Sequence, residues 1–406
     1  MKILVILSFN PYFQSSASAN RWLTLIEGLS SLGVKVELLI YGGFNSVEEA
    51  AINRISEYRE RVTCKYIEPK LIQGYWKRRY NTYIGDHLRE GRLVKLIIEE
   101  IENKGEIVWT DPSLFGYKLA IQLKKSQPNL RLFLELSEFP DIHKYNKGNF
   151  LQRFQANKSQ KFFEEKAFHV YDGLALMTKT LFQHYQSFAM PHPKFLHLPM
   201  TVNLERFTDG KTLVEGFQQP YIACVGVMND AKDGVSILIK AFAKITKEYP
   251  ALKLYLVGAW NYDTPIHQQL IKEYKLEDKV FWMGEFSSDQ IPSILKNASL
   301  LVLPRPPSKQ AQGGFPTKLG EYLATSNPIC ATNVGEIPDY LIDGESVYFA
   351  EPGSIVSFAN AMHRALSNPT VAKKVGANGK IVADKSFNKD IQAKILYDFL
   401  RENLQS

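Results

Sequence analysis

The sequence predicts an α/β protein built from two parallel-sheet domains. Short apolar runs that suit buried strands alternate with helical patterns along the whole chain, which is typical of parallel sheets covered by helices. The length of 406 residues suits two domains of about 200 residues each. The composition, with 45% hydrophobic and 22% charged residues, is that of a globular protein.

The first half of the chain predicts one sheet and its covering helices. Strands are expected at residues 3–7, 34–40, 62–67, 107–110, 132–136 and 173–177. Helices are expected at residues 18–32, 47–59, 83–103 and 149–169. Residues 199–220 show no clear period, and the strand and helix patterns restart after them. We therefore expect a first domain over residues 1–205 and a second over residues 206–385.

The second half repeats the same alternation of strands and helices. Strands are expected at residues 221–225, 252–258, 279–284, 300–303 and 328–331, with helices starting near residue 234 and spanning 318–325. In an open parallel sheet, ligands bind outside the carboxyl ends of the strands. The loops that follow these strands are therefore the candidate site.

Composition also bears on where the protein works. No apolar run approaches the roughly 18–20 residues of a membrane helix, and the opening MKILVILSFN is typical of a first strand rather than of a signal peptide. Three cysteines, far apart in sequence, argue against a disulfide framework or a zinc site based on cysteines. We expect a cytoplasmic protein with no metal.

The positive charge is concentrated in the first half of the chain. Up to Arg206 there are 28 Lys and Arg against 21 Asp and Glu, whereas the remainder is balanced. A cationic half suits an acidic surface, either anionic lipid or nucleic acid. The alternative is a generally solubilising charge, and no nucleic-acid recognition motif is present.

The most informative stretch is residues 299–336. A buried strand ends at Pro304, and Gly313 and Gly314 then supply a backbone that is free to take a positive φ and to approach a ligand. Pro316 and Thr317 predict the start of a helix. A glycine-rich loop that leads into a helix N-terminus is a ready site for phosphate, because its N–H groups and the helix dipole favour an anion.

Glu321 lies one turn into this helix, so its carboxylate is expected near the same site. A diphosphate repels a carboxylate. Hydrogen bonds from sugar hydroxyls are therefore the function we expect for Glu321.

This stretch resembles the donor-binding signature of the retaining GT-B glycosyltransferases with an E-x7-E motif (the family 4-like group). Its sequence is similar to that of the bacterial surface-polysaccharide branch of these enzymes. The matching residues are Gly314, Phe315, Pro316, Glu321, Ala324 and Pro328. The first Glu of the motif is replaced by Gly313. In the family that Glu is thought to hold hydroxyls of the donor sugar.

The resemblance implies two Rossmann-like domains that face each other across a cleft, with residues 386–406 forming a helix that crosses back to the first domain. It implies a metal-independent retaining hexosyltransferase without a cofactor. The donor would be a UDP- or GDP-sugar, and the acceptor a glycan or a lipid-linked glycan in surface-polysaccharide synthesis. The backbone just past residue 284 would bind the nucleotide base.

Cations for the donor diphosphate are expected in the second domain. Similar transferases carry Val-Gly-Arg and then Lys after the first strand of this domain; here Gly226 and Lys232 match, and Val227 replaces the Arg. Arg305 or Lys318 would supply the missing charge. The structural alternatives are a solvated loop lysine for Lys232, a salt bridge at the rim for Arg305 and a solvated residue of the helix for Lys318.

In the first domain, the resemblance places Ser15 and Ser16 where related enzymes have a Gly-Gly loop at the meeting point of donor and acceptor. An ordinary strand-to-helix loop, with Ser18 capping the helix, is the alternative. Glu138 follows a buried strand and is the candidate to steady the developing positive charge on the donor. The leaving phosphate takes the acceptor proton in the family, so no carboxylate nucleophile is required.

Aromatic residues lie beside cations in residues 75–80 and 149–169, which suits the lipid interface and predicts docking on the inner face of the membrane. A helix that covers the sheet with a solvated basic face explains residues 149–169 equally well.

Several motifs are absent: D-x-D, the phosphate-binding G-x-x-x-x-G-K-[ST], an early G-x-G-x-x-G and G-x-S-x-G. A non-catalytic paralogue that serves as a partner subunit, motivated by Val227 and Gly313, and a GT-B-fold sugar-nucleotide epimerase are the rival interpretations.

Overall fold

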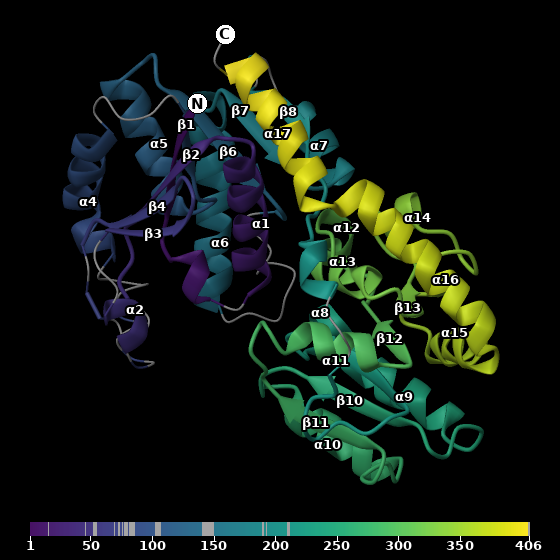
Figure 1. Cartoon of the computed structure of the whole chain (residues 1–406). Helices are drawn as coiled ribbons and strands as arrows, with labels where there is room; N and C mark the ends of the chain where they lie inside the picture. The colour runs from purple at the N-terminus through teal and green to yellow at the C-terminus, as the bar shows by residue number, and fades with distance from the viewer. Residues whose placement is uncertain are drawn as a thin grey trace. The chain divides into compact units, whose positions relative to one another are not determined.

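The structure is a computed structural model that divides into two compact units (Figure 1). It describes the chain except for residues 15, 45, 52–54, 69, 72–73, 75, 77–79, 81–85, 102–106, 140–149, 189–190, 192, 209–211 and 405–406. Unit 1 contains Met1–Lys144, Gly148–Pro199 and Asp390–Ser406, and unit 2 contains Met200–Lys389. The chain thus enters unit 2 slightly before the predicted boundary after residue 205.

The described residues of unit 1 form an eight-stranded sheet in the order β3-β4-β2-β1-β5-β6-β7-β8. The strands are β1 (Lys2–Leu7), β2 (Lys35–Ile40), β3 (Ile55–Arg59), β4 (Val62–Tyr66), β5 (Ile107–Thr110), β6 (Arg131–Leu136), β7 (Gly173–Leu176) and β8 (Lys194–His197). Each pairs with its neighbours in parallel, except that β3 is antiparallel to β4.

The prediction of a helix over residues 47–59 is wrong in its second part. Among the described residues of this range, α2 (Val47–Ala51) is helical and residues 55–59 form β3. A tight turn with Arg61 at a φ of 69° folds the chain back onto β4, so backbone groups of β3 bond to the neighbouring strand rather than along a helix. The sheet pairing therefore overrides the local pattern.

Successive residues of β1 pack on opposite faces of the sheet, as the two-residue period of a strand requires. Ile3, Val5 and Leu7 pack in one cluster with residues of α1 (Ala17–Ser31) and α17 (Lys389–Leu404). Leu4 and Ile6 pack in another cluster with α4 (Asp86–Ile101) and α5 (Leu114–Ser126). Unit 1 is thus a three-layered structure, completed by α6 (Phe150–Phe162) and α7 (Lys179–Gln186).

A buried ion pair fixes the end of unit 1. Arg21 of α1 donates from Nε to Glu135 Oε1 at 3.0 Å, and both side chains are at most 5% exposed. The remaining guanidinium nitrogens donate to the carbonyl oxygens of Pro199 (2.6 Å) and Leu198 (2.9 Å). Arg21 therefore holds the segment through which the chain leaves unit 1.

Unit 2 contains a six-stranded, wholly parallel sheet within its described residues, in the order β11-β10-β9-β12-β13-β14. The strands are β9 (Tyr221–Val225), β10 (Lys253–Val257), β11 (Val280–Gly284), β12 (Leu300–Leu303), β13 (Ile329–Thr332) and β14 (Tyr348–Ala350). The helices are α8 (Asp230–Asp233), α9 (Val235–Ile245), α10 (Thr264–Glu273), α11 (Ile291–Asn297), α12 (Lys309–Gly313), α13 (Thr317–Ala324), α14 (Ile337–Tyr340), α15 (Ile355–Ser367) and α16 (Pro369–Val382).

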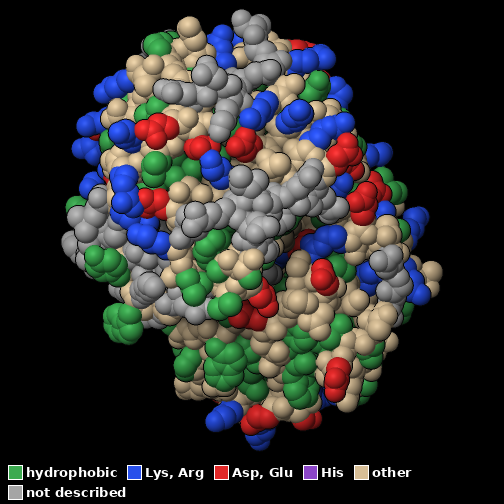
Figure 2. All heavy atoms as spheres, turned by 60° about the vertical axis from the view of Figure 1, so that its left-hand side comes forward, with side chains coloured by type: hydrophobic (Ala, Val, Ile, Leu, Met, Phe, Trp, Pro, Cys, Tyr) green, Lys and Arg blue, Asp and Glu red, His purple; other side chains and the backbone are tan. Residues whose placement is uncertain are grey.

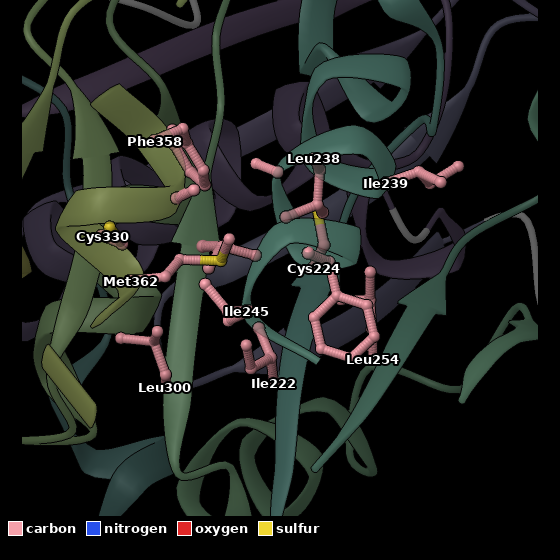
Figure 3. Packing of buried hydrophobic residues seen from close by; sticks show 14 of the residues in the cluster. Ile222, Cys224, Leu238, Ile239, Ile245, Leu254, Leu300, Cys330, Phe358 and Met362 are labelled. Carbon is pink, nitrogen blue, oxygen red and sulfur yellow. The ribbon is translucent and has the colours of Figure 1, made fainter. Parts of the chain in front are cut away.

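The core on one face of this sheet joins its central strands to two helices. Figure 3 shows Ile222, Leu254 and Leu300 from three neighbouring strands against Leu238 of α9 and Phe358 of α15. All five side chains are fully buried. The core therefore holds the strand ends, and the loops that follow them, in fixed positions.

The order of strands reverses between β9 and β12. From β9 the chain moves through β10 to β11 at one edge, and from β12 it moves through β13 to β14 at the other. Loops that leave two neighbouring strands in opposite directions open a crevice, where ligands of such folds bind. The loops after Val225 and Leu303 are consequently the candidate site of unit 2.

Candidate functional site

The glycine-rich loop after β12 contains a short helix that the sequence did not predict. Ser308 caps α12 by accepting the Ala311 N–H at 3.1 Å. Gly314 follows with φ −130° and ψ 141°, an extended conformation that any residue adopts. The expected use of a positive φ here is therefore wrong for Gly314, because α12 turns the chain.

Phe315 anchors the next part of this loop. Its side chain is buried, and its ring contacts those of Tyr340 (5.6 Å between centroids) and Phe387 (5.3 Å). α13 starts directly afterwards at Thr317, with Pro316 as its N-cap and no side chain capping its amides. The predicted helix start is correct to one residue. The Leu319 N–H donates to the Pro316 carbonyl oxygen at 2.9 Å, and no side chain caps the amides of Thr317 and Lys318, which suit another acceptor.

Lys318, the second residue of α13, forms an ion pair rather than a solvated side chain. Its Nζ lies 2.5 Å from Asp233 Oδ1, and the two side chains are 17% and 2% exposed. Asp233 also accepts the Met228 N–H at 2.9 Å. The ion pair thus ties α13, which follows β12, to the loop that follows β9.

Two glycines allow this close approach. A Cβ on Gly226 would lie 2.0 Å from Lys318 Nζ, and a Cβ on Gly234 would lie 2.0 Å from the Pro304 carbonyl oxygen. Gly234 also has a φ of 63°, in the left-handed region. A side chain at Gly234 would therefore clash with the backbone of Pro304, and a side chain at Gly226 would displace the Lys318 ammonium group.

Glu321, one turn further along α13, is bound by an arginine that the sequence analysis missed. Arg206 Nη1 donates to Glu321 Oε1 at 2.9 Å, and Arg206 Nη2 donates to the carbonyl and hydroxyl oxygens of Ser288 at 2.6 and 2.9 Å. Arg206 lies in the irregular stretch after the first domain. No spacing links position 206 to position 321, so the pairing emerges only from the fold.

Opposing effects act on the pKa of the Glu321 carboxyl. Burial raises its pKa above the ordinary value, whereas the positive charges of Arg206 and Lys318 lower it. The net direction is upward. Only 18% of the side chain is exposed. A hydroxyl donor that replaced water at this carboxylate would thus meet a partly desolvated acceptor.

Lys232 lies on α8, whose first turn is capped by Asn229 accepting the Lys232 N–H at 2.8 Å. Its ammonium group has no ion-pair or hydrogen-bond partner among the residues that the structure describes. Lys232 is therefore a half-exposed cation next to the Lys318–Asp233 pair in the same loop.

Asp230 holds the start of α8 in place. It accepts hydrogen bonds from Ser236 and from Nε2 of the fully buried His267. Burial alone would raise the Asp230 pKa, but these hydrogen bonds and the His267 charge lower it to about 2. The Asp230 carboxylate is thus ionised at neutral pH. Its hydrogen bonds lie within the loop, so Asp230 stabilises the helical turn that contains Lys232.

Arg305 is buried rather than at the rim. It is 4% exposed, with Nη1 3.5 Å from the Gly314 carbonyl oxygen, and its own carbonyl accepts the Thr332 hydroxyl at 2.8 Å. This position sets it inside the glycine-rich loop.

The structure does not show the site residues predicted in unit 1, Ser15, Ser16 and Glu138, in contact with one another. Ser16, and not Ser18, caps α1 by accepting the Ala19 N–H at 3.1 Å. Ser15 lies outside the described residues. Glu138 is exposed in the bend after β6. Their proposed roles at the donor stay predictions.

Comparison with known proteins identifies the part of the chain that carries the candidate site. Residues 210–382 match the model of the family "Glycosyl transferases group 1". The matched residues 210–382 include Lys232, Lys318 and Glu321, but not Arg206.

Individual relatives of the chain are similar over part of their length. An alpha-1,3/1,6-mannosyltransferase (ALG2) of Dictyostelium discoideum is 29% identical over 145 residues, which is 34% of this chain and 33% of the relative. The N-acetyl-alpha-D-glucosaminyl L-malate synthase of Bacillus anthracis is 28% identical over 173 residues, 42% of this chain and 43% of the relative. The chain thus spans between a third and a half of the length of each of these two relatives.

Solved structures share the fold of the whole chain, including the part outside residues 210–382. Sucrose-phosphate synthase from Thermosynechococcus elongatus has a TM-score of 0.77 at 17% identity, covering 99% of each chain. HepE from Anabaena, in complex with UDP and glucose, has a TM-score of 0.71 at 13% identity, covering 99% of this chain and all of HepE. The predicted GT-B fold of two parallel-sheet units is confirmed.

Proposed function

We propose that the chain is a glycosyltransferase that binds a nucleoside-diphosphate sugar in unit 2 and passes the sugar to a glycan or lipid-linked glycan. The observation that carries this proposal is α13, which presents uncapped amides, Lys318 and Glu321 at the point where the strand order of the unit 2 sheet reverses. Such a point combines the anion preference of a helix N-terminus with hydrogen-bond acceptors for a sugar.

The proposed roles follow from charge. The first amides of α13 and Lys232 bind the diphosphate, and Lys318, already paired with Asp233, adds a fixed positive end nearby. The second carboxylate oxygen of Glu321 accepts hydrogen bonds from the ribose hydroxyls. The loop after β11 carries the base. Gly313–Phe315 face the donor sugar through their backbone.

The similar proteins support a hexosyl donor but differ in the base. HepE was solved with UDP, and a relative from Corynebacterium glutamicum, 22% identical over 244 residues, is named as a GDP-mannose-dependent mannosyltransferase. We therefore propose a UDP- or GDP-hexose donor. Retention of configuration, independence of metal and a place in surface-polysaccharide synthesis complete the proposal.

Replacing Lys232 tests the diphosphate site. We expect Lys232→Ala to weaken binding of the preferred nucleoside diphosphate by about tenfold, since one half-exposed charged hydrogen bond is lost. The affinity for the nucleoside alone stays unchanged. Isothermal titration with UDP, GDP and ADP and their nucleosides measures both. Lys373→Ala, an exposed lysine of α16, is the matched control.

The same titration separates the rival functions. A chain that binds none of the three diphosphates contradicts the proposal and favours a non-catalytic partner subunit. Conversion of a UDP-sugar to its epimer without any acceptor favours a sugar-nucleotide epimerase.

Docking of unit 1 on an anionic membrane is a separate part of the proposal. Trp76 and Tyr80 are 79% and 53% exposed, whereas residues 75 and 77–79, which include the basic residues of this segment, lie outside the described residues. On the face shown in Figure 2, however, Lys and Arg are spread among Asp and Glu. No helix within the described part of the chain is apolar and long enough to span a membrane.

We expect the protein to float with vesicles that contain anionic phosphatidylglycerol and to stay behind with neutral phosphatidylcholine vesicles. Raising the salt concentration should release it, because screening weakens surface electrostatics. If the same fraction of protein floats with both kinds of vesicle, the proposal of electrostatic docking is wrong.

A further inference from the structure

Arg206 connects helix α13 to the loop that follows β11 in unit 2. We infer that Arg206 is a positioning residue of the nucleotide site: it holds one carboxylate oxygen of Glu321 so that the other accepts hydroxyl groups of the ribose. The inference rests on the proposed function, since it takes α13 as the nucleotide-binding helix.

The geometry constrains the guanidinium from both sides. One terminal nitrogen, Nη1, donates to Glu321 Oε1 at 2.9 Å, and the other, Nη2, donates to both oxygens of Ser288, which lies between β11 and α11. A guanidinium is planar and presents its donors in a rigid fork. The Glu321 oxygen is therefore set at a fixed place relative to the loop after β11.

The backbone under Arg206 is equally well held. Arg206 belongs to the short helical turn Leu204–Phe207, where Asn203 accepts the Glu205 N–H at 3.1 Å. The next residue, Phe207, is buried, and the guanidinium lies 5.9 Å from its ring centroid. Arg206 is thus part of an ordered turn, and its side chain is only 25% exposed.

Glu321 Oε2 remains the oxygen for a ligand. The Arg206 bond is made to Oε1, and Oε2 has no bond to any of the described residues. The charged groups that face this carboxylate are Arg206 and Lys318, with Asp233 behind Lys318 as its ion-pair partner. Lys318 is paired with Asp233, whereas Arg206 bonds Glu321 directly, so Arg206 is the cation that most directly keeps Glu321 ionised.

Loss of Arg206 would therefore have two effects at Glu321. The carboxylate would become free to rotate, so its hydrogen bonds to ribose would be made less often. Its pKa would rise further, because burial raises it and one of the two cations that lower it would be gone. A protonated carboxyl accepts fewer hydrogen bonds than a carboxylate.

The consequence is a defined selectivity. A site that hydrogen-bonds a hydroxyl rejects an analogue that lacks this hydroxyl, because the protein acceptor is then left unpaired. Wild-type protein is expected to bind its preferred nucleoside diphosphate at least about tenfold more tightly than the 2′-deoxy or 3′-deoxy form. Arg206→Gln is expected to bring at least one of these ratios close to one.

The experiment is isothermal titration of wild type, Arg206→Gln, Arg206→Lys and Arg364→Gln. The ligands are UDP, GDP and ADP, followed by the 2′-deoxy and 3′-deoxy forms of the one that binds. Arg364 pairs with Asp343 at 3.0 Å on α15 and is about half exposed, which makes it a matched arginine–carboxylate control. Its removal should leave the ratios unchanged, and Arg206→Lys, which keeps the charge without the fork, should restore part of the selectivity.

A pH series provides the second readout. Affinity for the ribonucleotide falls on acidification as Glu321 becomes protonated, and in Arg206→Gln this loss should begin at a higher pH than in wild type.

The outcomes distinguish the inference from the proposed function. Equal weakening of ribose and deoxyribose forms by Arg206→Gln, with an unshifted pH profile, overturns the positioning role and leaves a structural one. Failure of wild type to bind any of the three diphosphates overturns the proposed function and the inference with it.

Discussion

Glu321→Gln is expected to remove most of the affinity for the nucleoside diphosphate. The change eliminates the charge that accepts the ribose hydroxyls and leaves Arg206 without its partner at 2.9 Å. Hydrogen bonds to charged groups contribute about 1.5–3 kcal/mol each. The loss of one of them weakens binding by roughly 10- to 150-fold, and the loss of a second weakens it further. Titration calorimetry against wild type measures this directly.

The pH dependence of this effect has a definite sign. Burial raises the Glu321 pKa, so the carboxylate becomes protonated at a higher pH than an ordinary carboxyl as the solution is acidified. Nucleotide affinity should therefore fall above the usual carboxyl range in wild type and be flat there in Glu321→Gln.

Glu345→Gln is the control for Glu321→Gln, because Glu345 is exposed in the loop before β14 of the same unit. Both variants should keep the wild-type circular dichroism spectrum. Unchanged affinity in a folded Glu321→Gln protein would mean that this carboxylate does not contact the nucleotide.

Arg21→Met is expected to destabilise unit 1 by about 3–5 kcal/mol. Removal of the guanidinium leaves the buried Glu135 carboxylate without its cation and deprives the carbonyl groups of Leu198 and Pro199 of their donors. Burial lowers the pKa of Arg21, against the effect of Glu135, which shows that the charge is held in a desolvated place. Hydrogen exchange of α1 and β6 in increasing urea measures the change within unit 1.

Arg131→Met is the matched control in the same unit. Arg131 is 42% exposed and contacts Asp172 at 3.3 Å, so its loss should change stability by less than about 1 kcal/mol. The double variant Arg21→Met/Glu135→Gln should recover part of the loss, because no uncompensated charge remains. A cost for Arg21→Met no greater than that for Arg131→Met would refute the account of this buried pair.

The sheets could be predicted because their strands are buried on both faces. Residues 221–225 and 300–303 are continuous apolar runs, and residues 107–110 are apolar up to Thr110. The predicted bounds of all three agree with the structure. The antiparallel β3 was missed, since pairing with β4 decides its conformation. The bend at Gly314 was misjudged for a similar reason: the capped helix α12 before it directs the chain.

The candidate site could be predicted only where its residues are close in sequence. The start of α13 and the position of Glu321 follow from residues 313–321 alone. The partner of Lys318 is 85 positions away, and the partner of Glu321 is 115 positions away. Partners at such separations meet only because the strand order brings their loops together, and a single sequence carries no signal for that.

The contribution of α17 to unit 1 has a consequence for synthesis on the ribosome. Leu396, Leu400 and Leu404 are buried in the same cluster as Ile3 and Val5 of β1, at opposite ends of the chain. Unit 2 is continuous in sequence over Met200–Lys389, whereas unit 1 also needs residues 390–406. Translation of unit 1 therefore begins before that of unit 2 and ends after it. One apolar face of the unit 1 sheet is therefore partly exposed to solvent until α17 has been synthesised. Exposed apolar surface of this kind is what chaperones bind, so we expect the nascent chain to bind a chaperone in that interval.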